Sequence, residues 1–245
     1  MPPTVPFNHR GTWRTYTTAE GLAGLQAEHI GETDDGFLWI STWNSGISRF
    51  DGEEFRTFTR RDGLCGDQVM VSHLDNDGNL IFGTLDGGAC LYDGKKFTVP
   101  NGFPSTSVTF IYPDQKGRLW FGGSHTLGYW YNGQYHDLVP LYRQSFGMPP
   151  APYLPLQCWG IAEDAQGLIF IGGEYLVSFD GQTLQRHDQL EGCPEPGLNY
   201  SVCHRPDGGL WIGGQTLATL EDGRFEAVPL EFSGFIRKIR LDRQG

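Results

Sequence analysis

Hydrophobic and polar positions alternate with a period of two along most of the chain, in short runs separated by Asn-Gly, Asp-Gly and Gly-Gly pairs. The stretch 34–59, DDGFLWISTWNSGISRFDGEEFRTFT, shows the pattern, because each of its two Asp-Gly pairs is followed by an aromatic run. Alternation of this kind predicts half-buried β-strands, and the glycine pairs predict hairpin turns. Helical periodicity is absent. The pattern therefore predicts an all-β chain.

The glycine that precedes each aromatic run recurs at a regular interval. Its positions are Gly36, Gly78, Gly117, Gly167 and Gly208, with steps of 42, 39, 50 and 41 residues. A period of about 40 residues is typical of propeller blades and other repeat arrays. Each repeat is predicted to contain four antiparallel strands, which in the second repeat are residues 68–74, 79–84, 88–93 and 95–99. We therefore expect one β-propeller domain over residues 1–245, with repeats that start near residues 27, 69, 107, 157 and 199.

Large aromatic side chains follow the marker glycine in most repeats. A four-stranded sheet cannot bury both of its own faces, so neighbouring sheets must stack, and wide side chains fill the space between them. A base-stacking platform would instead require exposed rings and positive charge. We expect core packing between the sheets for one column of residues: Trp39, Phe82, Trp120, Phe170 and Trp211.

The first repeat reads DDGFLWIST and then SRFDGEEFRTFTRRDGL, and the four later repeats follow it less faithfully. This pattern resembles the two-component regulator propeller repeat, which occurs in the sensor regions of many bacterial signalling proteins. The resemblance covers nearly the whole chain from Gly11 onward. It departs from the family at Ser41, where glycine is usual, and in the fourth repeat, GLIFIGG, which lacks tryptophan. The resemblance implies a sensor-type β-propeller with a role in signal transduction, and it does not identify a ligand.

The strand count is uneven. Five repeats have complete middle strands, whereas the outermost strand occurs six times, first at residues 13–17, and the innermost strand occurs six times, last at residues 235–241. One blade is therefore split between the two ends. The chain is a fragment of a longer propeller, or a partner supplies strands, or five blades close the ring alone. We expect a fragment, with an attached signalling domain or self-association through the unpaired terminal strands.

Composition limits the partners. The net charge is −11 and the isoelectric point is near 5.0, so nucleic acid is not expected to bind. No apolar run is long enough to span a bilayer, and MPPTVPFNHR lacks the features of a secretory signal. We expect a soluble segment without membrane contact, cytoplasmic if Met1 is the native start. The five cysteines show no metal-binding or disulfide spacing and are expected to be ordinary buried thiols.

The innermost strands begin at the mouth of the predicted central channel, where ligands of propellers are expected to bind. Uncharged polar residues occupy equivalent positions there: Gln26, Gln68, Ser107, Gln157 and Asn199. They are candidates to bind a small ligand such as a sugar or a peptide. The alternative role is to hydrogen-bond neighbouring loops and to hold adjacent blades together.

Loops on the same rim form a second candidate surface. Residues 139–157, VPLYRQSFGMPPAPYLPLQ, are an insertion rich in proline and aromatic residues. They are expected either to pack over a blade edge or to form a lid or a partner-binding element. The candidate residues of this loop face are Trp43, Asn44, His125, Tyr142, Phe146 and Tyr153.

Catalysis finds little support in the sequence. His73 and His204 occupy equivalent positions near the end of the innermost strand, with His29 close to them in the repeat frame. Carboxylates beside the first turn of each repeat are expected to accept turn N–H groups, namely those of Glu32, Asp75, Asp114, Glu163 and Asp164. No nucleophile, metal or phosphate-binding motif occurs. We expect a non-enzymatic sensory or interaction propeller without catalytic residues, metal or cofactor; the alternative is an enzyme that resembles the streptogramin lyase or lactonase propellers.

Overall fold

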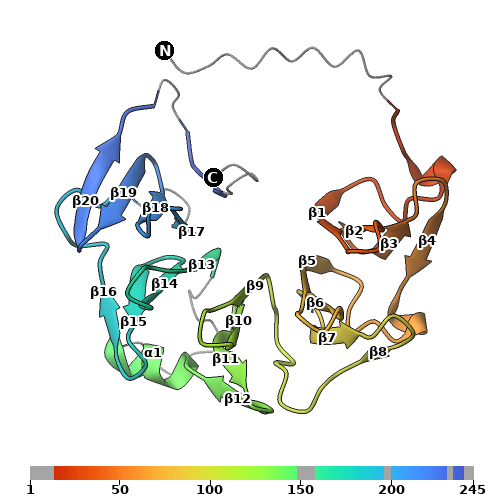
Figure 1. The fold of residues 1–245 in the computed structure, drawn as a ribbon, viewed down its shortest axis with the longest axis horizontal. Coiled ribbons are helices and arrows are strands. Elements are labelled where there is room, and N and C mark those ends of the chain that lie inside the picture. The colour runs from red at the N-terminus through yellow and green to blue at the C-terminus, as the bar shows by residue number, and fades with distance from the viewer. Residues whose placement is uncertain (1–13, 148–157, 196–199, 231–233, 240–245) are drawn as a thin grey trace.

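The computed structural model describes residues 14–147, 158–195, 200–230 and 234–239. Five separate four-stranded antiparallel sheets are arranged around a common axis, and together they form an open arc (Figure 1). In every sheet, strands that are consecutive in the sequence lie side by side, and the first of them is nearest the axis. The predicted all-β propeller architecture is confirmed.

The strands are short, and their bounds follow the repeat. The first sheet contains β1 (Ala27–Glu32), β2 (Leu38–Thr42), β3 (Gly46–Phe50) and β4 (Phe55–Phe58). The second contains β5 (Val69–Leu74), β6 (Leu80–Thr84), β7 (Gly88–Tyr92) and β8 (Phe97–Thr98). The third contains β9 (Phe110–Pro113), β10 (Leu119–Gly122), β11 (Leu127–Tyr131) and β12 (Gln134–Asp137). The fourth contains β13 (Gly160–Glu163), β14 (Ile169–Gly172), β15 (Leu176–Phe179) and β16 (Leu184–Arg186). The fifth contains β17 (Ser201–His204), β18 (Leu210–Gly213), β19 (Leu217–Glu221) and β20 (Arg224–Val228).

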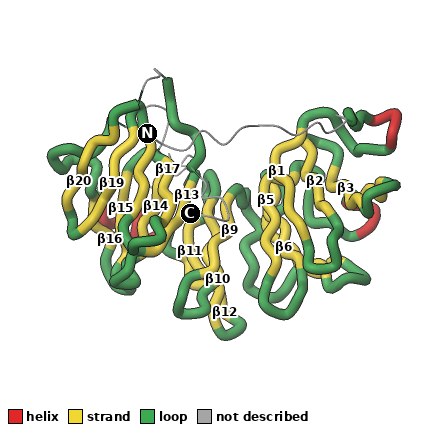
Figure 2. The backbone as a smooth tube through the Cα atoms, turned by 45° about the horizontal axis from the view of Figure 1, so that its top comes forward, coloured by secondary structure: helices red, strands yellow, loops and turns green. Residues whose placement is uncertain are grey.

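The marker glycine recurs because the first turn of each sheet requires it. Its φ angle is positive in all five turns, for example +84° at Gly36 and +76° at Gly117, a conformation that other residues adopt only with strain. The strands run from one rim of the arc to the other, so the loops gather at two rims (Figure 2). Turns between first and second strands share one rim with turns between third and fourth strands. The remaining loops lie at the opposite rim.

In the sheets that have a neighbour on each side, the second strand contacts both neighbours through alternate residues. Trp39 packs against Phe82 and Tyr92 of the next sheet, with ring centroids 5.6 and 5.3 Å away. Trp120 likewise reaches Phe179 of the next sheet, at 5.8 Å. The expectation that all five residues form one column is wrong for Phe82, because Phe82 lies one position later in its repeat than the others. Phe82 therefore faces the first sheet, and Ile81 faces the third sheet.

Burial of the predicted column follows its position in the arc. Trp39, Trp120 and Phe170 are buried between neighbouring sheets, and Phe82 is buried on its own side. Trp211 is only half-buried. It lies in the last sheet of the arc, where the described residues provide no further sheet to cover it (Figure 1).

The described terminal segments dock where the split blade was predicted. Tyr16 packs edge-on against Phe50 and Phe55 of the first sheet, with ring centroids 5.0 and 5.4 Å away. Near the other end, the N–H of Ile236 donates to the carbonyl of Gly214 at 2.9 Å. Neither segment forms a regular strand within its described residues. Trp13 and residues 240 and 241 of the predicted strands lie outside the described part.

Three short helices complete the described part of the fold. Two 3-10 turns, η1 (Thr18–Glu20) and η2 (Arg60–Asp62), have the same capping box and end at a glycine with positive φ. The helix α1 (Val139–Ser145) forms part of the insertion that the sequence predicted as a loop. Pro140 lies in its first turn, where the missing N–H is not needed. The helix packs at the outer edge of the fourth sheet (Figure 1). This position supports the prediction that the insertion packs over a blade edge.

Candidate functional site

The candidates at the inner rim lie at or before the starts of the innermost strands. Gln26 is exposed and donates to Glu28 Oε1 at 2.8 Å, and its carbonyl accepts from the N–H of Trp43. The Gln68 carbonyl accepts from Leu85 at 2.9 Å. The Ser107 hydroxyl is buried and has no hydrogen-bond partner within the described ranges. Gln157 and Asn199 lie outside these ranges. No hydrogen bond joins Gln26, Gln68 and Ser107 to one another, so their binding role stays a prediction.

The candidates of the loop face differ in exposure. Trp43 is 37% exposed, and Asn44 and His125 are also exposed. Phe146 is half-buried, whereas Tyr142 of α1 is buried in the core beside the fourth sheet and is not available at the surface. Tyr153 lies outside the described residues. Of this set, the residues in the turns after the second strands are the accessible ones.

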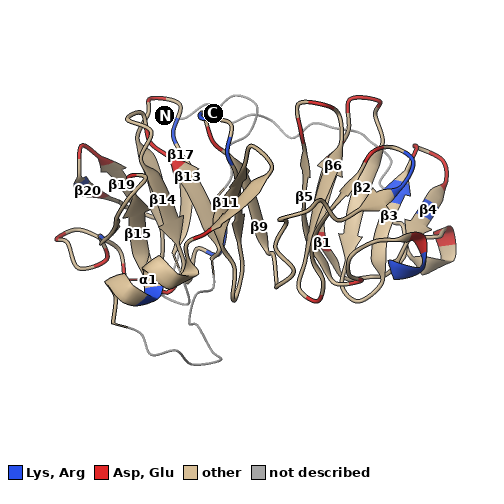
Figure 3. Ribbon diagram, turned by 90° about the horizontal axis from the view of Figure 1, so that it is seen from below, with Lys and Arg blue, Asp and Glu red and all other residues tan. Residues whose placement is uncertain are grey.

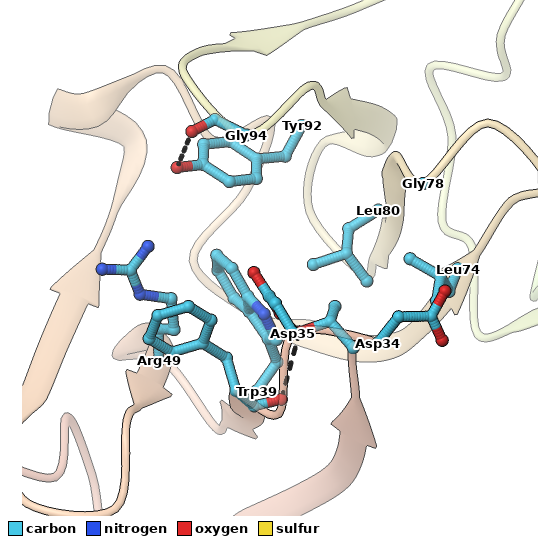
Figure 4. Close-up of a pocket in the computed structure, with 11 residues that line it drawn as sticks. Asp34, Asp35, Trp39, Arg49, Leu74, Gly78, Leu80, Tyr92 and Gly94 are labelled. Carbon is cyan, nitrogen blue, oxygen red and sulfur yellow. Dashed lines mark hydrogen bonds between the residues drawn. The ribbon is translucent and has the colours of Figure 1, made fainter.

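A pocket of about 290 Å³ lies at the opposite rim, between the first and second sheets (Figure 4). The turn at residues 33–37 and strands β2 and β3 form one wall, and the ends of β5, β6 and β7 form the other. The volume is near the lower end of the range for ligand pockets. Sequence reasoning missed this pocket because it assigned Trp39 to core packing alone.

One buried donor beside the pocket has no acceptor among the described residues. Trp39 is 2% exposed, and its indole N–H has no hydrogen-bond partner. Arg49 lies beside it, with the guanidinium carbon 4.3 Å from the centroid of Phe37 and 6.0 Å from that of Trp39. No hydrogen bond or ion pair joins Arg49 to another described residue. A buried donor without an acceptor is unfavourable by about 1–3 kcal/mol, so the indole of Trp39 is incompletely satisfied, whereas Arg49 is only half-buried and its charge interacts with that of Asp51.

In the third repeat a carboxylate completes a related arrangement, whose arginine occupies the position of Phe37 and not that of Arg49. There the carboxylate of Asp114 accepts from Trp120 Nε1 at 2.7 Å and pairs with the guanidinium of Arg118. Arg118 stacks over Trp120 with its guanidinium carbon 5.1 Å from the ring centroid. The other oxygen of Asp114 accepts from the backbone N–H groups of Lys116 and Arg118, both at 2.9 Å. One carboxylate thus satisfies the tryptophan, the arginine and the turn.

Thr33 occupies the equivalent of Asp114 in the first repeat. The two turns have the same backbone hydrogen bonds, since Thr33 N–H donates to the Phe37 carbonyl and Asp114 N–H donates to that of Arg118, both at 3.0 Å. The Thr33 hydroxyl donates to Asp35 Oδ1 at 2.5 Å and does not contact Trp39. The incomplete site therefore results from the residue type at position 33.

The turn carboxylates confirm most of the sequence prediction. Asp75, Asp114 and Asp164 each accept backbone N–H groups of their own turn. Glu163 instead accepts from the N–H of Gln115 at 2.7 Å, which belongs to the turn of the preceding repeat. The useful signal in the sequence was the missing aspartate at position 33.

The charged groups of the pocket are separated in space. Figure 4 shows Arg49 on one side of the pocket and Asp34 on the opposite side, beside Leu74. Asp35 also lines the pocket. Along the described ribbon, acidic residues lie mostly in the loops at the rims, and the strands carry few charged residues (Figure 3). The pocket therefore combines one cationic group, two anionic groups and apolar side chains.

A second pocket of about 340 Å³ lies on the same rim between the fourth and fifth sheets. His187 contributes to it and is 8% exposed; its Nε2 lies 2.8 Å from Ser178 Oγ, and its Nδ1 has no partner within the described ranges. Burial lowers the pKa of His187 below its ordinary value, although the nearby Asp188 charge acts in the opposite direction. His187 is therefore neutral at pH 7.

This burial predicts an acid-sensitive fold. Because the pKa of His187 is lower in the folded chain than in the unfolded chain, the unfolded chain binds the proton more readily, and the free energy of unfolding falls as the pH drops below about 6.5. His187→Gln retains an amide that reaches Ser178 and cannot titrate. We expect its urea midpoint to fall less than that of the parent between pH 7.5 and 5.5. Parallel pH profiles would contradict this assignment.

The other histidines and the cysteines show no catalytic grouping. Burial lowers the pKa of His73. His204 is exposed, and within the described ranges neither His73 nor His204 is hydrogen-bonded to a carboxylate. No group of histidine, cysteine, aspartate and glutamate that could bind a metal occurs among the described residues. All five cysteines are free, and burial raises the pKa of the Cys158 thiol to about 12.

No helix in the described part of the chain has the length and apolar character required to cross a bilayer.

Comparison with known proteins supports the repeat and the fold. Residues 102–125 match the family described as two component regulator propeller, which confirms the resemblance seen in the sequence. No match occurs among curated proteins. The extracellular domain assigned to the hybrid two component system BT3049 from B. thetaiotaomicron is 19% identical, with a TM-score of 0.67 over 87% of this chain. The chain covers 31% of that domain, less than a third of its length.

Two further solved structures share the fold. A catalytically inactive virginiamycin B lyase from Staphylococcus aureus, solved with quinupristin, is 13% identical, with a TM-score of 0.59 over 84% of this chain and 71% of the lyase. The computationally designed protein Ika8 is also 13% identical, with a TM-score of 0.59 over 90% of this chain and 67% of its own. At this level of identity the likeness shows the propeller fold alone.

Proposed function

Because the chain is a β-propeller with the two-component regulator propeller repeat, we propose that it is a non-enzymatic sensory or interaction domain that binds a small ligand. The observation that carries this proposal is the pocket between the first and second sheets, which combines Arg49, Asp34 and Asp35 with apolar side chains. No hydrogen bond or ion pair joins the guanidinium of Arg49 to another described residue. A few charged groups in a largely apolar pocket are typical of a small-ligand site.

The propeller suits such a role because its site lies between two sheets. A ligand in this pocket contacts the turn of one sheet and strands of the next, so its binding favours one packing of the two sheets. We expect occupancy to be passed to an attached signalling domain, as in the sensor regions that carry this repeat. The similar sensor structure is an extracellular domain, and it gives the expected cytoplasmic location no support.

An enzyme remains the second candidate, since a lyase shares the fold. The geometry of the described residues favours binding. The recurring histidines His73 and His204 lack the carboxylate partners that orient a general base. The enzyme alternative therefore becomes an outcome of the binding experiment.

A thermal-shift screen tests the proposal. The whole chain is heated with separate panels of amino acids, organic acids and oligosaccharides, and each mixture is then analysed by mass spectrometry. A ligand at 100 times its Kd is expected to raise the Tm by about 5–10 °C and to be recovered unchanged. Recovery of a chemically modified compound would show that the protein is an enzyme and not only a binding domain. If no compound shifts the Tm, the proposal fails.

A further inference from the structure

We propose that the thiols of Cys65 and Cys90 join in a disulfide bond when the chain folds in the presence of a disulfide oxidant such as oxidised glutathione. Cys65 lies in the linker between β4 and β5, and Cys90 lies in β7. The bond therefore ties the connection between the first and second sheets to the third strand of the second sheet. This inference does not depend on the proposed function, because other residues line the pocket.

The two thiols lie beside one another in the folded chain. The backbone N–H of Cys65 donates to Cys90 Sγ at 3.3 Å, and the two thiols are hydrogen-bonded to each other. Cys65 Sγ also lies 3.8 Å from the carbonyl oxygen of Gly88, which precedes Cys90 in the same strand. Both cysteines belong to the apolar cluster between the first and second sheets. Residues that are 25 positions apart in the sequence thus bring their thiols to one place.

The linker is held against the turn that precedes β7. A Cβ placed at Gly87 would lie 1.9 Å from the carbonyl oxygen of Cys65, so the two backbones are in direct contact. Arg60 of the same linker forms an ion pair with Asp86 at 2.7 Å. A disulfide can form only where the backbones of both cysteines already lie close together. These contacts keep Cys65 within reach of Cys90.

The other three cysteines lie in or beside the fourth and fifth sheets. The thiol of Cys158 donates to the carbonyl of Gly160 at 3.7 Å, and the thiol of Cys193 lies 3.8 Å from the hydroxyl oxygen of Tyr200. Cys203 lies in β17. The fold thus separates these three from the pair between the first and second sheets. We expect one disulfide per chain and three free thiols.

The bond forms by two steps of thiol–disulfide exchange. The thiolate of one cysteine attacks oxidised glutathione and releases one glutathione, and the other cysteine then displaces the second glutathione from the mixed disulfide. Two protein thiols lose two electrons and two protons, and one glutathione disulfide becomes two glutathione thiols. Cys65 is the partly exposed member and Cys90 is buried, so Cys65 meets the oxidant first.

The contact between the thiols affects the two steps differently. Hydrogen bonds from the thiol and the backbone N–H of Cys65 lower the pKa of Cys90, which favours the thiolate that completes the bond. The hydrogen bond with Cys90 raises the pKa of Cys65. The first step is therefore slow in the folded chain and faster while the linker is open during folding.

Refolding of the whole chain tests the inference. The chain is unfolded in urea with a reductant, diluted into a mixture of reduced and oxidised glutathione, and treated with iodoacetamide to label the remaining thiols. Cys65 and Cys90 lie in one tryptic peptide, residues 62–95, because no lysine or arginine lies between Arg61 and Lys95. We expect this peptide to be unlabelled and lighter by two hydrogen atoms than its reduced form.

Three other results overturn the inference. They are label on both cysteines of this peptide, a disulfide from either of them to another peptide, and a glutathione adduct that persists on Cys65. The last result would show that Cys90 does not reach the mixed disulfide. The same mixture is also applied for longer to the reduced chain in its folded state, so that the answer does not depend on the yield of refolding.

Two variants and the Tm distinguish this bond from general oxidation. A disulfide that closes a loop of this length is expected to raise the Tm of the oxidised chain by about 5–10 °C over that of the reduced chain. Cys65→Ser should abolish both this rise and the loss of two hydrogen atoms. The matched control is Cys203→Ser, which removes another half-buried thiol and should leave both unchanged. A Tm rise that persists in Cys65→Ser, or that is lost in Cys203→Ser, contradicts the assignment.

Discussion

Replacement of Asp114 by alanine is expected to lower the free energy of unfolding by about 3–5 kcal/mol. Asp114 and its partner Arg118 are 8% and 9% exposed, so loss of the carboxylate leaves a buried guanidinium without its counter-ion. The indole N–H of Trp120 and two backbone N–H groups of the turn lose the same acceptor. Urea denaturation monitored by tryptophan fluorescence measures the change.

Asp164→Ala is the matched control for this prediction. Asp164 accepts two backbone N–H groups of the equivalent turn, from Gln166 at 3.0 Å and Leu168 at 2.9 Å, and forms no ion pair. Its replacement should lower the free energy of unfolding by about 1–2 kcal/mol. Equal losses for the two variants would show that the buried ion pair adds nothing beyond the turn.

Gly88→Ala is expected to have the second large effect. Gly88 has a φ of +77°, and a Cβ placed there would lie 2.1 Å from the carbonyl oxygen of Pro104. Left-handed strain contributes about 1–2 kcal/mol and the forced backbone shift about 1–3 kcal/mol, so a loss of about 2–5 kcal/mol is expected. The same carbonyl accepts from Ala89 at 3.0 Å, and that hydrogen bond would be disturbed as well.

Gly94→Ala separates the two contributions. Gly94 has a φ of +86°, but a Cβ there would meet no atom within 4 Å. Only the conformational part, about 1–2 kcal/mol, should be lost. A Gly88→Ala variant that is no less stable than Gly94→Ala would show that the linker at Pro104 moves aside freely. Both free energies are obtained from urea denaturation under the same conditions.

Much of the fold was predictable because it depends on local turn chemistry that is repeated. In the second repeat the expected strand at 79–84 is observed as β6, Leu80–Thr84, and the expected strand at 88–93 as β7, Gly88–Tyr92. Glycines with positive φ fix the turns, and aspartates cap them, whatever the rest of the molecule does. The turn glycines and the capping aspartates can each be recognised from the sequence alone.

The remaining features depend on which neighbour a side chain meets. Phe82 was assigned to the wrong face because a shift of one residue in a strand reverses the direction of the side chain. The helix α1 was missed because packing of Tyr142 on the fourth sheet stabilises seven residues that have no helical periodicity of their own. The pocket was missed because an unsatisfied indole N–H is a property of three-dimensional surroundings.

The exchange of aspartate for threonine at one turn has a wider consequence for tandem architectures. When one turn is repeated along a chain, a single exchange changes the side-chain hydrogen bonds of one copy and leaves the backbone of all copies alike. Thr33 and Asp114 show this, because their turns share the same backbone hydrogen bonds, yet only Asp114 gives the tryptophan of its own sheet an acceptor. Each copy can therefore vary its side chains without cost to the architecture.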